Sequence, residues 1–201
     1  MSMIQVPAQG PTVKGFDIYH GNSVNIMDLA KGGMEFCFHK ATEGTTTVDP
    51  MIKTRWPFIA EAGLVRGAYH FFHPSQDPIA QAQFFTRTMA PLLTFGDILI
   101  MDWEVSDQLD AADDQDRGLV FLQTVEKLLL KKPIIYGSPY FIEEMQLDSR
   151  FSSYKLWIAE YGVQMPKVPT PWTNWTFWQT GDQGLDYDLF NGSLADLKSL
   201  S

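Results

Sequence analysis

The chain has 201 residues, of which 45% are hydrophobic and 19% are charged, and its formal net charge at pH 7 is −9. Such a chain closes one sizeable core, so we expect a single domain. The acidic balance, with no basic cluster beyond Lys131-Lys132, argues against a nucleic-acid partner, and a single cysteine, Cys37, excludes an internal disulfide.

The first residues, MSMIQVPAQGPTVKG, lack the basic start and the apolar run of a secretory signal. No later run reaches the ~18 apolar residues of a membrane span. We therefore expect a chain made in the cytoplasm without an export signal and without a membrane span.

Short segments rich in aromatic and β-branched residues recur along the chain and predict eight strands. In chain order they are GFDIY (15–19), EFCFHKA (35–41), VRGAYHFF (65–72), DILIMDWE (97–104), KPIIYG (132–137), KLWIAEY (155–161), NWTFWQT (174–180) and LDYDLF (185–190).

Stretches with helical spacing follow the first five of these strands, at 24–31, 51–62, 78–89, 111–131 and 139–145. The fourth is the clearest, because one apolar stripe runs along it, made of Leu119, Leu122, Val125, Leu128 and Leu129. The later segment VQMPKVPTPWTN is too rich in proline for a helix, so the last three strands must connect by loops.

This alternation predicts an α/β fold in which a parallel sheet curls into a modified TIM-like barrel, (β/α)5(β)3, with reacting groups at the carboxyl ends of the strands. Asp17 lies near the end of the first strand, Asp102 and Glu104 end the fourth, and Glu160 ends the sixth. Strand side chains alternate faces, so Asp102 and Glu104 point the same way, with Cα atoms roughly 6.5 to 7 Å apart, and Trp103 points the other way.

A series of motifs in order resembles the glycoside hydrolase family 25 muramidases, the Chalaropsis-type lysozymes. The motifs are GFDIYHG, FHKATEG, GAYHFFHP, DWE, PIIYG, LWIAEYG and FWQT…GLDYDLFNG. The resemblance covers Val13 to about Gly192 and implies hydrolysis of the β-1,4 bond between N-acetylmuramic acid and N-acetylglucosamine in peptidoglycan. On this basis 13–201 is the expected catalytic barrel and 1–12 an N-terminal extension.

The resemblance also implies the catalytic residues. Glu104 matches the general acid, whose pKa must be raised, and an anionic Asp102 beside it would supply that bias. Asp102 matches the group that stabilises the reacting centre, where the substrate's own 2-acetamido group can act as nucleophile. Asp17 and Asp186 match two further acidic positions, although Asp188 leaves the register of LDYD open by two residues.

Aromatic side chains stack on the apolar faces of sugar rings, so several are candidates for the substrate-binding walls. For two of the four, Trp157 and Trp178, packing in the core is an equally good interpretation. Polar side chains would bind acetamido or hydroxyl groups. The full substrate-binding set is Tyr69, Tyr136, Trp157, Trp178, Gln179 and Lys40.

The histidines His39, His70 and His73 suggest a metal at first glance, but no third partner stands at a fixed spacing. His39 should face the helical layer, opposite to Lys40, as a structural histidine. We therefore expect no metal and no cofactor.

Two other functions remain open: a glycan-binding barrel without activity, and a glycosidase acting on chitin-type N-acetylglucosamine oligomers. The expected partner is the glycan strand of peptidoglycan. Action at the cell wall or periplasm, starting from an acidic chain without a signal, would need a separate delivery or secretion partner. The stereochemical outcome depends on the carboxyl-to-carboxyl distance, which Cα spacing does not determine.

Overall fold

The computed structural model describes residues 3–182 and 184–200. Eight strands form one closed barrel, in the spatial order β2-β3-β5-β6-β7-β8-β10-β11, with a β2–β3 pairing that completes the ring. The barrel strands are β2 (Thr12–Ile18), β3 (Phe36–Glu43), β5 (Val65–Phe71), β6 (Ile98–Asp102), β7 (Ile134–Gly137), β8 (Leu156–Ala159), β10 (Phe177–Gly181) and β11 (Asp186–Asn191).

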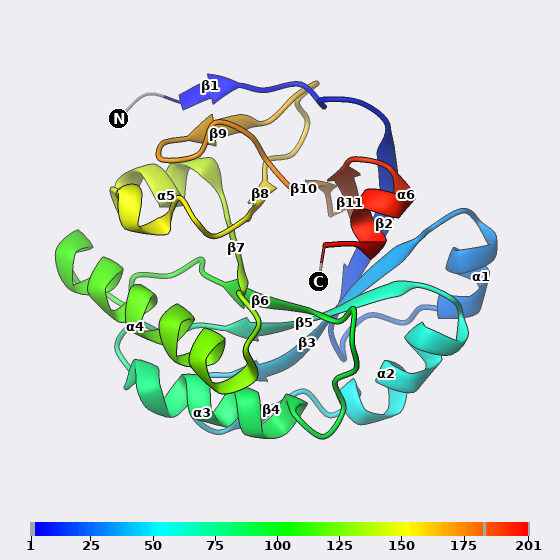
Figure 1. The fold of residues 1–201 in the computed structure, drawn as a ribbon, viewed down its shortest axis with the longest axis horizontal. Helices are drawn as coiled ribbons and strands as arrows, with labels where there is room; N and C mark the ends of the chain where they lie inside the picture. The colour runs from blue at the N-terminus through cyan, green and yellow to red at the C-terminus, as the bar shows by residue number, and fades with distance from the viewer. Residues whose placement is uncertain (1–2, 183, 201) are drawn as a thin grey trace.

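Helices follow the first five barrel strands, as predicted, and wrap around part of the barrel (Figure 1). They are α1 (Ile26–Lys31), α2 (Ile52–Glu61), α3 (Pro78–Met89), α4 (Ala111–Leu129) and α5 (Pro139–Glu144). Smaller elements are β1 (Met3–Gln5), β4 (Thr47–Val48), a 3-10 turn η1 (Ser149–Phe151), β9 (Lys167–Pro169) and α6 (Leu194–Lys198). No helix in the described part of the chain is long and apolar enough to cross a membrane.

The direction of the strands confirms the predicted (β/α)5(β)3 barrel. Every neighbouring pair from β2 round to β10 is parallel, whereas β11 runs antiparallel to both β10 and β2. Because β11 is reversed, its first residue, Asp186, lies at the same end of the barrel as the last residues of the parallel strands. Asp186 pairs directly with Asp17 of β2.

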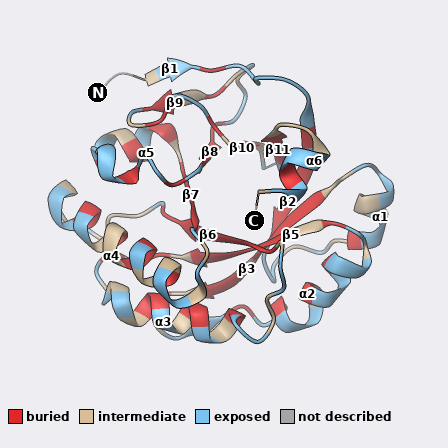
Figure 2. Cartoon of the chain, viewed as in Figure 1, coloured by how far each residue is buried: buried red, intermediate tan, exposed pale blue. Residues whose placement is uncertain are grey.

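Side-chain alternation divides the apolar residues into two layers. Phe36 and Phe38 of β3 fill the barrel interior with Trp157 and Phe177, at ring-centroid distances of 4.9–5.2 Å. The intervening Cys37 joins the outer layer between strands and helices. In Figure 2 most of the barrel strands are buried, whereas the helices around them carry both buried and exposed residues.

Where the ring of helices ends, other elements cover the barrel. The strands β1 and β9 pair as an antiparallel ribbon (Figure 1), so residues 3–5 of the expected N-terminal extension lie against the barrel's outer wall. Two buried tryptophans fasten this wall, because Trp175 Nε1 donates to Val6 O at 2.8 Å and Trp172 Nε1 donates to Tyr154 O at 2.7 Å. The prediction that the last three strands connect by loops is therefore correct. Hydrogen bonds from two indole rings hold the segments that cover this part of the barrel.

The predicted apolar stripe of α4 is correct only in part. Phe121, Leu122 and Val125 are buried, but Leu128 is 50% exposed, so its assignment to the buried face was wrong. The helix also buries polar Asp114 and Gln115 in its first turns, whereas Leu128 lies in its last turn.

Candidate active site

The carboxyl ends of the strands surround a cavity of about 250 Å³. All four predicted catalytic residues line it: Asp17 from the end of β2, Asp102 from the end of β6, Glu104 two residues beyond, and Asp186 from the start of β11. The barrel thus brings together acids that are up to 169 positions apart in sequence, from Asp17 to Asp186.

Alternation at the end of β6 places its two acids as predicted. Asp102 and Glu104 both line the cavity, whereas Trp103 between them is buried outside the barrel. The Trp103 ring packs among Phe72, Phe141 and Phe151, with ring centroids 5.9–6.1 Å away. This anchor, together with the Trp103 N–H bond to Tyr136 O at 3.0 Å, holds the acids on either side in place.

The two acids form a coupled pair. Burial raises the pKa of Asp102 well above its usual range, and the charge of Glu104 and a hydrogen-bonding contact with its carboxyl act in the same direction. Desolvation also raises the pKa of Glu104, which is the more exposed of the two. Carboxylates in contact repel each other, so the pair keeps one proton between them. Burial favours that proton on Asp102, whereas the sequence led us to expect it on Glu104.

A second carboxyl pair lies on the opposite wall. Burial raises the pKa of Asp17 to about 7, and the charge of Asp186 adds to the effect. Burial likewise raises the pKa of Asp188 well above its usual range, followed by the charge of Asp17. Asp17 Oδ2 accepts from Gln179 Nε2 at 2.6 Å, and Asp188 Oδ1 accepts from Trp157 Nε1 at 2.8 Å. The wall therefore favours a proton shared between Asp17 and Asp188.

Asp186 and Asp188, between which the sequence left the fourth acidic position open, lie at different depths in the barrel. Both point inward, but Asp186 pairs with Asp17 at the mouth, whereas Asp188 pairs with Gly15 one step below and is 2% exposed. Only Asp186 lines the cavity. Asp186 is thus the acid that a ligand can touch, and Asp188 supports Asp17 from beneath.

The predicted substrate-binding residues separate into two groups. Tyr69, Tyr136, Trp157 and Gln179 line the cavity. Trp178 does not, since it lies in the outer layer, with its ring centroid 5.9 Å from that of Trp175. Neighbouring residues of one strand face opposite sides, so Trp178 must point outward if Gln179 points inward.

Lys40 lies beside the cavity without lining it. Its Nζ is 2.6 Å from Glu43 Oε2 and 4.9 Å from the centre of the Phe71 ring. Its positive charge acts on both acids of the pair, opposing the rise in the pKa values of Asp102 and Glu104. In this structure Lys40 tunes the acids and makes no wall of the cavity.

Two further residues of the site were missed from the sequence. Tyr161 and Asp182 line the cavity from the loops after β8 and β10. Tyr161 OH donates to Gln179 Oε1 at 2.5 Å, and Tyr136 OH donates to the same oxygen at 2.7 Å, which fixes the amide so that its N–H points at Asp17. Loop residues follow no periodic pattern. The only sequence signal for these two residues is a neighbouring glycine that marks a turn.

A second hollow, of about 480 Å³, adjoins the first and shares three residues with it: Glu104, Tyr136 and Tyr161. Its other lining residues include Tyr140, Glu160 and Lys167. Glu104 therefore stands between two hollows, where it can reach an atom that joins two ligand units.

The histidines have structural surroundings. His39 Nδ1 lies 2.7 Å from Lys40 O, and His70 bonds to Thr42 and Gln81 in the outer layer. Burial lowers the pKa of His39 to about 4 and that of His70 to about 3. Across residues 3–182 and 184–200, no group of three His, Cys, Asp or Glu side chains is arranged to hold a metal ion.

Comparison with known proteins agrees with this geometry. The chain is 35% identical over 175 residues to the Escherichia coli (strain K12) protein YegX, a match that covers 83% of this chain and 62% of YegX. It is 28% identical to the N,O-diacetylmuramidase of Chalaropsis sp, covering 94% of this chain and 99% of that protein. The structure of the Streptomyces coelicolor lysozyme superposes with a TM-score of 0.86 at 27% identity, covering 94% of this chain and 96% of that one.

The chain spans less than two thirds of the length of YegX. A family model describing the glycosyl hydrolases family 25 matches residues 16–188, which run from the strand that carries Asp17 to the one that carries Asp186. The matched region thus contains all four predicted catalytic residues, and the chain belongs to glycosyl hydrolase family 25.

Proposed function

We propose that this chain is a peptidoglycan hydrolase, an N-acetylmuramidase that cleaves the β-1,4 bond between N-acetylmuramic acid and N-acetylglucosamine. The observation that carries the proposal is the pair Asp102–Glu104 at the junction of two hollows, facing Asp17 and Asp186 across the first. The names of the relatives, a lysozyme and an N,O-diacetylmuramidase, support this substrate class.

Glu104 is the proposed general acid. It is the exposed member of the pair and adjoins both hollows, so it is placed to meet a glycosidic oxygen lying between them. The pair holds one proton, which moves from Asp102 to Glu104 and from Glu104 to the leaving oxygen as the C–O bond breaks. Once the proton has left, both carboxylates are anionic beside a sugar ring that is becoming positively charged, and this favours the transition state over the ground state.

The first hollow then receives the sugar that bears the reacting carbon. There the carbonyl oxygen of the substrate's 2-acetamido group attacks the anomeric carbon as the leaving oxygen departs. Asp102 accepts from the acetamido N–H, whose nitrogen gains positive charge. Water next opens the cyclic intermediate, and Glu104, now a carboxylate, takes the proton of that water.

Digestion of purified peptidoglycan tests the proposed bond. We expect fragments with muramic acid at the new reducing end, identified by mass spectrometry after borohydride reduction. Reducing ends made of N-acetylglucosamine would contradict the proposal, and so would binding without release. Activity on chitin oligomers alone would favour the other glycosidase.

Two variants test the role of Glu104. We expect Glu104→Gln to lower kcat about 10²–10⁴-fold with an unchanged circular dichroism spectrum, because general acid catalysis contributes a factor of about that size. Glu61→Gln makes the same chemical change at the exposed end of α2, away from the cavity, and should keep full activity. Equal losses in both variants would remove Glu104 from the reaction.

Removing the acetyl from the substrate's 2-acetamido group tests whether this group acts as the nucleophile. De-N-acetylated peptidoglycan should be cleaved at least 100-fold more slowly, with KM changed far less than kcat. Equal rates on both substrates would point instead to a nucleophilic carboxylate. For a protein acting on the wall, we further propose that the chain reaches its substrate after export or release from the cytoplasm.

A further inference from the structure

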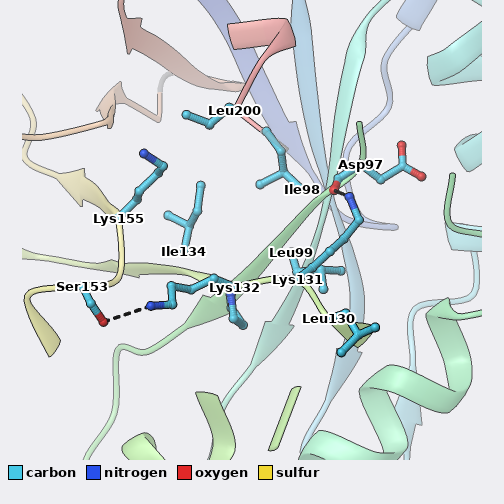
Figure 3. Close-up of a pocket in the computed structure, with 11 residues that line it drawn as sticks. Asp97, Ile98, Leu99, Leu130, Lys131, Lys132, Ile134, Ser153, Lys155 and Leu200 are labelled. Carbon is cyan, nitrogen blue, oxygen red and sulfur yellow. Dashed lines mark hydrogen bonds between the residues drawn. The ribbon is translucent and has the colours of Figure 1, made fainter. Parts of the chain in front are cut away.

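The Lys131-Lys132 pair, set aside as too small for a nucleic-acid site, lies beside a cavity at the opposite end of the barrel. This base cavity has a volume of about 260 Å³ and opens where strands begin: Ile98 and Ile134 start β6 and β7, and Lys155 directly precedes β8. It is separate from the proposed catalytic acids, which lie at the strands' carboxyl ends. Figure 3 shows the side chains that surround it.

The wall of the base cavity combines apolar and cationic groups. Its apolar lining residues are Ile98, Leu99, Leu130, Pro133, Ile134 and Leu200. Three lysines stand around this part, namely Lys131, Lys132 and Lys155.

The positive charge of the base cavity is not cancelled from within. Its one acidic lining residue, Asp97, is already bound by Arg66, at 2.6 Å from Nε to Oδ1 and 3.0 Å from Nη2 to Oδ2. An ammonium group has three donors. Lys131 uses one on Asp97 O and Lys132 uses one on Ser153 Oγ, with Glu126 Oε1 at 3.9 Å from Lys132 Nζ.

The side-chain nitrogen of Lys155 makes no hydrogen bond or ion pair within the described residues. In a chain of net charge −9, this end of the barrel therefore holds a local concentration of cations with donors to spare. Such a group attracts an anion.

Two large apolar side chains beside the cavity point into solvent. Leu130 is 89% exposed and Phe95 is 91% exposed, the two highest values among the large hydrophobic residues described. Leu130 also has φ 54°, a left-handed conformation that costs a leucine more than a glycine. Lys131 Nζ lies 5.8 Å from the centre of the Phe95 ring, so the apolar and cationic groups are continuous.

We propose that the base cavity binds a single-chain anionic amphiphile, with its hydrocarbon chain against Ile98, Ile134 and Leu200 and its carboxylate or phosphate among the lysines. An apolar cavity of ~150 Å³ already accepts a molecule as large as benzene, so this one has room for a short alkyl chain. The exposed Leu130 and Phe95 then cover the part of the chain that emerges. This site is independent of the proposed hydrolase activity.

Calorimetric titration of the intact protein with amphiphiles below their micelle concentrations tests the proposal. Decanoate and decyl phosphate should each bind with one-to-one stoichiometry, while inorganic phosphate and decanol should bind at least tenfold more weakly. Between hexanoate and octanoate the affinity should rise about fourfold per added methylene, the fold-change that corresponds to burying one CH₂. An affinity independent of chain length would overturn the proposal.

Charge variants locate the head group. The double variant Lys132→Gln/Lys155→Gln removes two exposed ammonium groups and should weaken decanoate binding at least tenfold without lowering Tm. The matched control Lys31→Gln/Lys53→Gln makes the same change in total charge on α1 and α2 and should bind as the parent does. Equal weakening in both would mean that only net charge matters, against a defined site.

Binding to lipid vesicles distinguishes between a free amphiphile and membrane lipid as the ligand. Sedimentation with vesicles of one part phosphatidylglycerol to three parts phosphatidylcholine should leave the protein in the supernatant, while decanoate still binds. Co-sedimentation without binding of monomeric decanoate would overturn the proposal in favour of a membrane-docking surface.

Discussion

Asp188→Asn tests whether a proton is stored in the wall of the site. Asp188 is 2% exposed, and its Oδ2 has no hydrogen-bond partner, since the group beside it is the carboxyl of Asp17. Two acceptors in contact need a proton between them, which is why burial and Asp17 together raise the pKa of Asp188. Asparagine has the same shape and offers Asp17 a permanent N–H, while its oxygen can still accept from Trp157.

The size of the effect follows from linkage. The usual pKa of an aspartate is 3.8, so below that pH Asp188 is protonated in both the folded and the unfolded chain, and the variant gains nothing from the missing charge. Above it the unfolded chain releases the proton that the folded chain keeps, and the parent loses stability by about 1.4 kcal/mol per pH unit. Asparagine does not titrate, so from pH 5 to pH 7 the advantage of the variant should grow by at most about 3 kcal/mol.

Urea unfolding followed by tryptophan fluorescence at pH 5, 6 and 7 measures this growth as a shift in midpoint. The exposed Asp113→Asn is the matched control and should show a difference that stays constant with pH. If Asp188→Asn also gives the same difference at pH 5 and pH 7, then Asp188 is ionised in the folded protein and no proton is shared with Asp17.

Three further changes test the packing that supports the site. Burial raises the pKa of Asp114 to about 7, so Asp114→Asn should stabilise the protein by at most about 4 kcal/mol at pH 7 and by little at pH 4, by calorimetry. Gly118→Ala would place a Cβ 2.4 Å from the Trp103 ring and should cost about 1–3 kcal/mol in urea unfolding and lower kcat, since that ring anchors the acids. Arg66→Met leaves buried Asp97 unpaired and should cost about 3–5 kcal/mol by thermal unfolding.

Matched changes separate these effects from general damage. Gly10→Ala places a Cβ where no atom lies within 4 Å and should leave stability unchanged, so a similar cost in Gly10→Ala and Gly118→Ala would contradict the Trp103 contact. Equal stabilisation by Asp114→Asn at pH 4 and pH 7 would rule out a titrating carboxyl. If replacing the partner of Asp97 costs less than 1 kcal/mol, the ion pair is not the buried clamp that its 2.6 Å contact indicates.

The sequence by itself determined the features that follow from short-range periodicity. Alternation along a strand put Asp102 and Glu104 on one face and Trp103 on the other, and strand–helix order predicted the barrel. The same rule, applied consistently, would have excluded Trp178, because it cannot share a face with Gln179. The error came from assigning both by chemistry and not by position.

Only the tertiary structure decided what depends on contacts between distant segments. Leu128 is 50% exposed in the last turn of α4, and periodicity does not reveal how far along a helix its neighbours extend. Tyr161 and Asp182 reach the cavity from loops, which have no repeat to read. The raised pKa of Asp102 follows from desolvation, a property of the surrounding atoms in three dimensions and not of the residue or its neighbours in sequence.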